Sequence, residues 1–389
     1  MAGADAAVDP DPDTTSTTPV VVLMAASSPW SRVVAEYLSE SGLPVHVLDF
    51  NDPSGPGWNR EQHARAIDAL RPKIASLRAV PLPRPFPLRV LVGAWRLRRA
   101  AAGCDARAVL ALYGGVQAAI ACLGGLPYGV FLVGSDVMQG DPLRRLILRV
   151  SLNRAAAVLA NGRHLAEQTR ALAPRARVQQ LYLGVDLERF RPPPLRNRAP
   201  RFVCSRAFSA ILDNATIVRA VAALPSVPAD FEMAFLSSGP LLDETVALAD
   251  RVLAPAARRG VSFGRGVSDS QLVAALRSAT FYVSASLSDG ASSSLLEAMA
   301  CGLFPIVSDI PASREWITHG ENGLLFSPGD PGALARCLTA AMEGVPWMES
   351  AVETNLRIVA ERADADVNMR QLCRLLSRLA QNAPAATAL

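Results

Sequence analysis

A strand, a loop of small polar residues and a helix follow one another between residues 281 and 302, and this order narrows the fold to the α/β class. Residues 281–283 are β-branched or aromatic and predict a strand, residues 284–292 a loop, and residues 294–300 a helix that ends at Gly302. The N-terminal part repeats the order, with an apolar strand over 19–24, a helix over 31–41 and a strand over 45–50. Such repeats predict doubly wound parallel sheets, which bind ligands at the carboxyl ends of their strands.

The start of the helix near residue 293 predicts an anion site. Ser292 or Ser293 is a natural N-cap, because its hydroxyl accepts a hydrogen bond from a first-turn amide. The remaining amides and the positive end of the helix dipole suit an anion such as a diphosphate, and small side chains let it approach closely. The backbone expected to bind this ligand comprises Gly290, Ala291, Ser292, Ser293, Ser294 and Leu295.

Two carboxylates stand on either side of this helix start. Asp289 lies in the loop and Glu297 on the second helical turn, so one can face a sugar and the other a ribose. The alternative is an ordinary buried helix that its serines merely cap, with Glu297 pointing to solvent.

Asp289, seven intervening residues and Glu297, followed by Ala-Met-Ala-Cys-Gly, resemble the acidic signature of the family 4 glycosyltransferases. Ser308-Asp309 and the run Gly-Glu-Asn-Gly-Leu-Leu at 320–325 continue the resemblance. It implies that the second acid holds the nucleotide ribose and that the first, catalytic acid contacts the donor sugar. The first acid here is Asp in place of the more usual Glu, and Ala291-Ser292 replace an aromatic-glycine pair.

The resemblance also implies the architecture. It predicts a GT-B fold, in which two Rossmann-like domains face each other across a cleft. We expect a disordered acidic tail over 1–18, an N-terminal acceptor domain over 19–190 with a crossover helix over 366–382, and a nucleotide-sugar domain over 191–365. At 389 residues the chain is long enough for two cores.

Further donor residues follow from the same resemblance. Arg206 matches an arginine that clamps the donor diphosphate, whereas Ile211 occupies the position of a second clamping residue, a lysine. A surface ion pair of Arg206 with Asp213 is the alternative. Other predicted donor contacts, in loops after strands, are Gly239, Arg265 and Val267.

The acceptor side is expected on the first domain. Ser28 and Trp30 follow the first strand, with simple packing as the alternative to ligand contact. The run Gly-Ser-Asp-Val at 134–137 resembles the acceptor loop of the family, with Val133 where many members have histidine. We therefore predict an acceptor-side role for Ser135 and a catalytic one for Asp136, which otherwise caps the next helix.

Charge is unevenly distributed along the chain. Residues 51–200 carry 23 Arg+Lys against 9 Asp+Glu, whereas residues 201–389 carry 15 against 19. The arginines of residues 60–100 indicate either a solvated helix face or an interfacial helix that meets anionic lipid or a lipid-linked acceptor. Nucleic acid is not expected as a partner, because no binding module accompanies the arginines.

The uncharged run at 108–134 is long enough to span a membrane, but its glycines and proline favour strand, helix and strand of a sheet. The six cysteines are scattered and show no paired spacing, which favours a reducing compartment. We expect a cytoplasmic protein, peripheral at the inner face of the membrane, with no cofactor and no metal.

The predicted function is retaining transfer of a hexosyl group from a nucleotide-diphospho-sugar to a glycan acceptor or a lipid-linked precursor in polysaccharide biosynthesis. Arg206 and the helix amides would stabilise the departing diphosphate. Two alternatives remain at this point: a non-catalytic GT-B subunit that binds a partner transferase, and a nucleotide-sugar epimerase.

Overall fold

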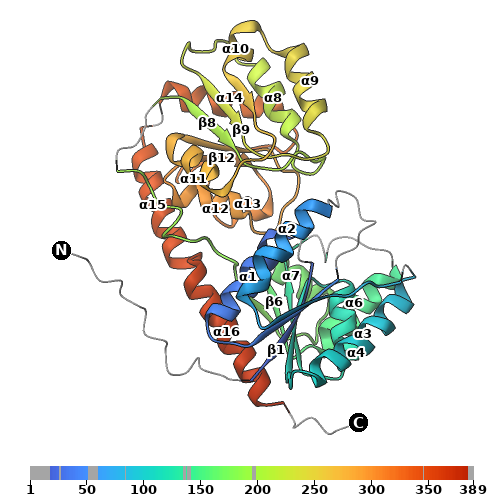
Figure 1. Cartoon of the computed structure of the whole chain (residues 1–389). Coiled ribbons are helices and arrows are strands. Elements are labelled where there is room, and N and C mark those ends of the chain that lie inside the picture. The colour runs from blue at the N-terminus through green and yellow to red at the C-terminus, as the bar shows by residue number, and fades with distance from the viewer. Residues whose placement is uncertain are drawn as a thin grey trace, which may run out of the picture. The chain divides into compact units, whose positions relative to one another are not determined.

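The computed structural model describes residues 18–25, 28–50, 60–83, 85–134, 137, 142–194, 199–344 and 346–383. The chain divides into two compact units, one of residues 1–181 and 367–389 and one of residues 182–366. We call them unit 1 and unit 2 (Figure 1).

Unit 1 is built on a seven-stranded parallel sheet in the order β3-β2-β1-β4-β5-β6-β7. Its strands are β1 (Val20–Met24), β2 (Val45–Asp49), β3 (Ser76–Ala79), β4 (Ala108–Leu112), β5 (Tyr128–Leu132), β6 (Ala157–Ala160) and β7 (Val178–Gln180). The central strands β1, β4, β5 and β6 are wholly buried, as expected of parallel strands that helices cover on both faces. The chain order reverses between β1 and β4, so this sheet has its switch point there.

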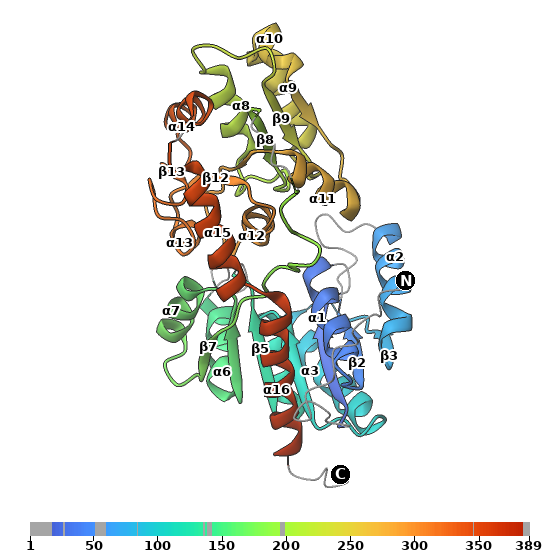
Figure 2. The same ribbon diagram turned by 90° about the vertical axis from the view of Figure 1, so that its left-hand side faces the viewer.

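The helices of unit 1 lie on both faces of that sheet. They are α1 (Pro29–Glu40), α2 (Arg60–Leu70), the 3₁₀ turn η1 (Arg71–Lys73), α3 (Phe86–Ala102), α4 (Val116–Gly124), α6 (Pro142–Arg154), α7 (Arg163–Leu172) and α16 (Ala365–Gln381). Figure 1 shows α1 and α16 on one face and α3, α4 and α6 on the other. Figure 2 shows α16 lying over β5, where Leu379 reaches Gly129.

Unit 2 is built on a six-stranded parallel sheet in the order β10-β9-β8-β11-β12-β13. Its strands are β8 (Arg201–Cys204), β9 (Glu232–Phe235), β10 (Val261–Phe263), β11 (Phe281–Ser284), β12 (Phe304–Ser308) and β13 (Leu324–Phe326). Its helices are α8 (Asn214–Ala222), α9 (Leu242–Val252), α10 (Pro255–Arg259), α11 (Asp269–Ser278), α12 (Ser293–Ala300), α13 (Pro311–Arg314), α14 (Pro331–Glu343) and α15 (Met348–Arg362). Here too the order reverses between neighbouring strands, at β8 and β11.

The boundary between the units falls before Tyr182, whereas the sequence placed it after residue 190. The buried Tyr182 hydroxyl donates to Glu315, and Arg362 donates to that hydroxyl at 3.2 Å. Val185 forms a parallel bridge with Asp364. These contacts attach residues 182–190 to unit 2, because the partners Glu315, Arg362 and Asp364 all belong to that unit.

The uncharged run at 108–134 forms β4, α4 and β5, as predicted. Among the described residues, no helix has the length and apolar character that crossing a membrane requires.

Candidate functional site

The loops at the carboxyl ends of the unit 2 strands are tied to one another. The loop after β8 meets the loop after β9, where the Phe208 amide donates to the Ser238 carbonyl at 3.0 Å. It also meets the loop after β11, where the Leu287 amide donates to the Ile211 carbonyl at 2.8 Å. The sheet therefore gathers at one edge the loops in which the sequence predicted a donor site.

The first turn of α12 keeps backbone donors available. Ser292 is the N-cap, and its hydroxyl accepts the Leu295 amide at 3.3 Å. The amides of Ser293 and Ser294 have no hydrogen-bond partner within the described residues. An anion placed over this turn would meet those two donors and the positive end of the helix dipole.

Arg206 lies at this helix start. Its Nη2 atom is 2.6 Å from Oδ2 of Asp289, and its Nη1 atom donates to the hydroxyls of Ser292 at 3.1 Å and Ser294 at 3.0 Å. Both charged side chains are largely buried, with 13% of Arg206 and 19% of Asp289 exposed. The Nε atom of Arg206 is buried without a partner within the described residues.

Hydrogen bonds from α8 fix the backbone of the loop that carries Arg206. The side-chain Nδ2 of Asn214, the first residue of α8, donates to the backbone carbonyls of Arg206 and Ala207 at 3.3 and 3.1 Å. Asp213 caps the same helix by accepting from Thr216, so the alternative pair of Arg206 with Asp213 does not form. Burial is the largest single effect on Arg206 and opposes its charge, but Asp289, together with Tyr282 and Cys204, outweighs burial and raises the guanidinium pKa.

Tyr282 of β11 contacts the helix start from within the sheet. It is fully buried, and its hydroxyl donates to Oγ of Ser294 at 2.9 Å. We call Arg206, Tyr282, Asp289, Ser292 and Ser294 the donor cluster. It joins residues from the loop after β8, from β11 and from the start of α12 in one hydrogen-bonded group.

Glu297 is half-buried on the second turn of α12, and its carboxylate forms no hydrogen bond or ion pair with any described residue. Burial raises its pKa from 4.5 to about 7, with Arg189 partly opposing this effect and Asp269 adding to it. Arg189 itself pairs with Asp269 at 3.1 Å. The expectation that Glu297 flanks the helix start fits this position better than the solvent-facing alternative.

Gly239 lies against the loop that carries Arg206. Its φ is +155°, and a Cβ atom there would stand 2.5 Å from the Phe208 carbonyl oxygen, so only glycine fits. A Cβ on Gly266 would lie 3.7 Å from Oγ of Ser238, so the loop after β10 adjoins the loop after β9.

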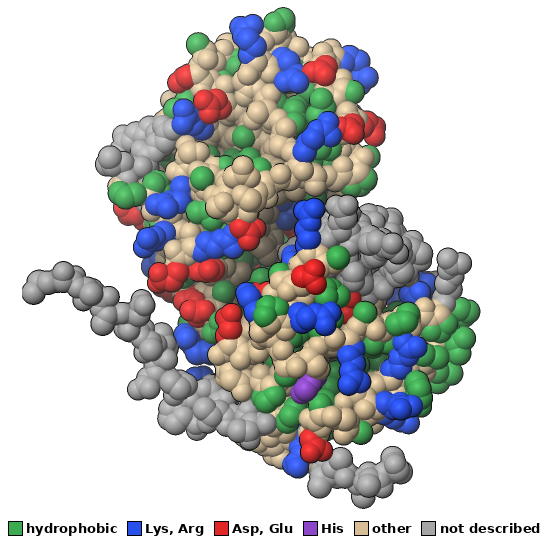
Figure 3. Space-filling model, viewed as in Figure 1, with side chains coloured by type: hydrophobic (Ala, Val, Ile, Leu, Met, Phe, Trp, Pro, Cys, Tyr) green, Lys and Arg blue, Asp and Glu red, His purple; other side chains and the backbone are tan. Residues whose placement is uncertain are grey.

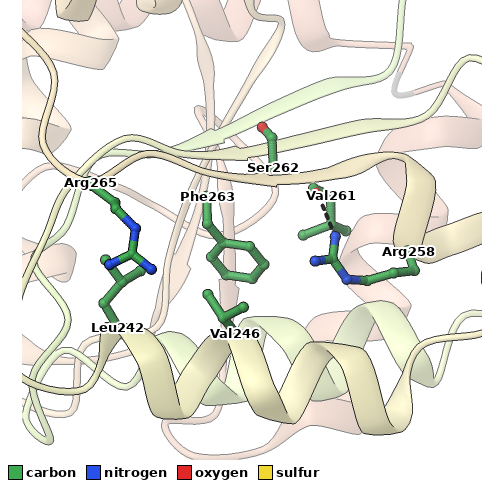
Figure 4. Close-up of a pocket in the computed structure, with 7 residues that line it drawn as sticks. All are labelled: Leu242, Val246, Arg258, Val261, Ser262, Phe263 and Arg265. Atoms are coloured by element: carbon green, nitrogen blue, oxygen red, sulfur yellow. Dashed lines mark hydrogen bonds between the residues drawn. The ribbon is translucent and has the colours of Figure 1, made fainter.

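Arg265 points elsewhere. It pairs with Asp243 at 2.9 Å and lines a cavity of about 330 Å³ between α9 and the edge strand β10. Figure 4 shows Phe263 in the middle of this cavity, between Arg265 and Arg258. In this conformation the Arg265 side chain does not join the donor cluster. Val267 and Ala291 both pack against the apolar cluster beneath α12.

The predicted acceptor residues are only partly described. Ser28 Oγ accepts from the Tyr113 hydroxyl at 3.1 Å. Trp30 belongs to α1, but its side chain lies outside the described part of the structure, as do Ser135 and Asp136.

Tyr113 is the residue that the sequence interpretation missed. It follows β4, its φ of +94° lies in a region that non-glycine residues rarely adopt, and its hydroxyl reaches the loop after β1. The pair Tyr113–Ser28 thus marks the switch point of the unit 1 sheet. The sequence feature that could have identified Tyr113 is its position between an apolar strand and Gly114-Gly115.

The described residues contain no group of three or more His, Cys, Asp or Glu side chains that could hold a metal ion.

Two family models match consecutive parts of the chain. Residues 32–189 match the model described as Glycosyltransferase Family 4, and residues 202–343 match the model described as Glycosyl transferases group 1.

Solved structures with the same fold cover nearly the whole chain. Sucrose-phosphate synthase from Thermosynechococcus elongatus superposes with a TM-score of 0.73 at 17% identity, over 93% of this chain and 99% of that one. HepE from Anabaena, in complex with UDP, gives 0.75 at 15% identity, over 93% and 100%. The lipopolysaccharide outer core galactosyltransferase WaaB gives 0.67 at 16% identity, over 93% and 100%. These structures establish the fold.

One curated protein matches a short stretch. The O-antigen biosynthesis protein RfbC of Myxococcus xanthus is 47% identical over 49 residues, which are 13% of this chain and 4% of that protein.

Proposed function

This chain belongs to the GT-B glycosyltransferases of the family 4 and group 1 type, and we propose that it transfers a hexosyl group from a nucleotide-diphospho-sugar to a glycan acceptor with retention of anomeric configuration. The observation that carries the proposal is the position of Arg206, buried at the start of α12 beside the two unpartnered amides of Ser293 and Ser294. A guanidinium and helix amides together provide converging donors for a diphosphate.

In the proposed reaction the bond from the anomeric carbon to the diphosphate breaks, and its electron pair leaves with the phosphate oxygen. Arg206 and the α12 amides stabilise that charge, which is the main electrostatic demand of the step. The acceptor hydroxyl attacks from the same face and passes its proton to the departing phosphate. No enzymic nucleophile and no metal ion enters the proposal.

Asp289 and Glu297 have separate proposed roles. Asp289 keeps Oδ2 on Arg206 and Oδ1 on the Gly290 amide at 2.9 Å, and each oxygen has a lone pair left to accept from a sugar hydroxyl. Glu297, without a protein partner, is proposed to accept from the ribose hydroxyls.

The acceptor is proposed to bind to unit 1, beside Ser28 and Tyr113, and to be a glycan or a lipid-linked precursor of a polysaccharide. The similarity to an O-antigen biosynthesis protein and to a lipopolysaccharide galactosyltransferase supports that choice. The proposed place of action is the cytoplasm, at the inner face of the membrane. The scattered cysteines, all unpaired, fit a reducing compartment.

A binding screen tests the donor site. UDP-, GDP-, ADP- and dTDP-sugars are titrated into the full chain, into Arg206→Ala and into a matched control, Arg219→Ala, whose arginine is exposed on α8. At least one donor should bind the wild type and the control equally, while Arg206→Ala binds about 10- to 100-fold more weakly through the loss of charged hydrogen bonds. Failure of every donor to bind, or equal binding by Arg206→Ala, would refute the site.

A GT-B subunit that binds donor without turning it over is the second candidate. Ile211 stands where the resemblance expects a lysine, and 46% of it is exposed. Turnover separates the candidates: product whose anomeric configuration by NMR equals that of the donor supports the transferase, whereas binding without turnover supports the subunit.

A further inference from the structure

Two helices of unit 1 expose apolar stripes. Leu88, Leu91 and Trp95 on α3 share one side of the helix, since they are spaced i, i+3 and i+7, and Leu143, Leu146 and Val150 repeat that spacing on α6. The exposed fractions are 60% for Leu91, 55% for Trp95, 60% for Leu143 and 56% for Leu146. We call these six residues the apolar face.

The two stripes belong to one surface. The helix α4 packs against both α3 and α6, and the Arg144 guanidinium of the first turn of α6 lies 5.6 Å from the centre of the Phe86 ring in the first turn of α3. Leu123, at the end of α4 beside Arg98 of α3, is a further apolar side chain on these helices, with 40% of it exposed. Figure 3 shows hydrophobic side chains gathered at the edge of the molecule over these helices, with blue side chains among them.

The charged residues of α3 and α6 all have one sign. Neither α3 nor α6 contains Asp or Glu, and the arginines on them are Arg89, Arg96, Arg98, Arg99, Arg144, Arg145, Arg149 and Arg154. Arg96 donates to the Pro81 carbonyl and Arg98 to the Leu123 carbonyl, both at 2.8 Å. Arg99 stacks on Trp95 at 5.0 Å. Because carbonyls and a ring do not neutralise charge, Arg96, Arg98 and Arg99 keep this surface basic.

We propose that the apolar face and its arginines dock on the surface of an anionic lipid bilayer. Tryptophan and leucine side chains enter the boundary between headgroups and acyl chains, while guanidinium groups pair with lipid phosphates. A second copy of this chain fits poorly, since it would bring two arginine-rich surfaces together. The inference rests on the membrane location in the proposed function and gives it a surface, but its test does not use the transfer reaction.

The test measures binding of the full chain to vesicles by co-sedimentation. Vesicles of phosphatidylcholine alone are compared with a mixture of phosphatidylcholine and phosphatidylglycerol. The apolar variant is Leu91→Ser/Trp95→Ser, and the charge variant is Arg145→Gln/Arg149→Gln. The control is Val33→Ser, since Val33 is 57% exposed on α1 of the same unit.

The wild type and the control should bind the anionic vesicles and leave phosphatidylcholine largely free. Each double variant should bind at least several-fold more weakly, and added salt should weaken wild-type binding. Absence of wild-type binding, or equal binding by all variants, would overturn the proposal. So would a wild-type dimer that the apolar variant dissociates, because the face would then be a protein interface. Donor binding measured on the same samples keeps the two proposals apart: if it persists without vesicle binding, only the docking surface is wrong.

Discussion

Glu297→Gln should make the protein more stable at pH 8 while weakening its hold on the donor. The carboxylate is half-buried, and no described hydrogen-bond donor compensates for the water it has lost. Glutamine has nearly the same shape and no charge, so it occupies the same place without this cost. Stability alone would not favour an ionisable side chain at position 297.

The size of the effect follows from the pKa of Glu297. Burial raises it from 4.5 to about 7, and at 1.36 kcal/mol per pKa unit this corresponds to about 3 kcal/mol. Since the folded state holds the proton more tightly than the unfolded state, stability falls as the pH rises from about 4.5 to about 7 and then levels off. Glu297→Gln should therefore match the wild type near pH 4 and exceed it by about 3 kcal/mol at pH 8.

Urea unfolding across this pH range measures the difference, and calorimetry with the donor identified by the screen measures affinity. Glu353→Gln, an exposed position on α15, is the control and should change neither. Donor affinity of Glu297→Gln should drop by about tenfold, as a charged acceptor becomes a neutral one. The reasoning fails if the variant is no more stable than the wild type at pH 8, or if the two stability profiles run parallel.

Two further substitutions test the packing of the donor cluster. Ser294→Ala should lower the free energy of unfolding by about 1–3 kcal/mol in urea unfolding, because it leaves the buried Tyr282 hydroxyl without its acceptor. Adding Tyr282→Phe should recover most of that loss. An unchanged midpoint for Ser294→Ala would contradict this geometry. Gly239→Ala should lower the free energy of unfolding by about 3 kcal/mol or more in thermal unfolding, because its Cβ meets the Phe208 backbone. Gly320→Ala is the control: its φ is +81° but the space around it is open, so it should lose only about 1 kcal/mol through backbone strain. Equal losses for the two glycines would show that the close contact is absent.

The parts of the fold that the sequence predicted are those with local signals. Apolar strands followed by small-residue loops predicted parallel α/β sheets, and the expected helix over 294–300 differs from α12 by one residue. The α/β class and the GT-B fold are confirmed. Capping chemistry predicted Ser292 or Ser293 as the N-cap, and the structure shows Ser292.

What the sequence did not predict depends on contacts between distant residues. The resemblance placed Arg206 and Asp289 at one site but did not predict their ion pair, because they are 83 residues apart and meet through the neighbouring positions of β8 and β11. Tyr113 gains its position at the switch point from the pairing of β1 with β4, which no local pattern reveals. The apolar stripe on α6 was not predicted, because the spacing of leucines in a helix does not show whether they face the core or solvent.

The return of α16 to unit 1 affects how the chain can fold during synthesis. Leu372, Leu376 and Ala380 of α16 are buried, so the core of unit 1 is complete only after residues 365–381 have left the ribosome. Unit 2, by contrast, is one uninterrupted segment and can finish first, against the usual rule that N-terminal parts fold earliest. A premature stop codon before residue 365 would thus leave the C-terminal Rossmann-like unit almost whole and deprive the N-terminal one of a covering helix.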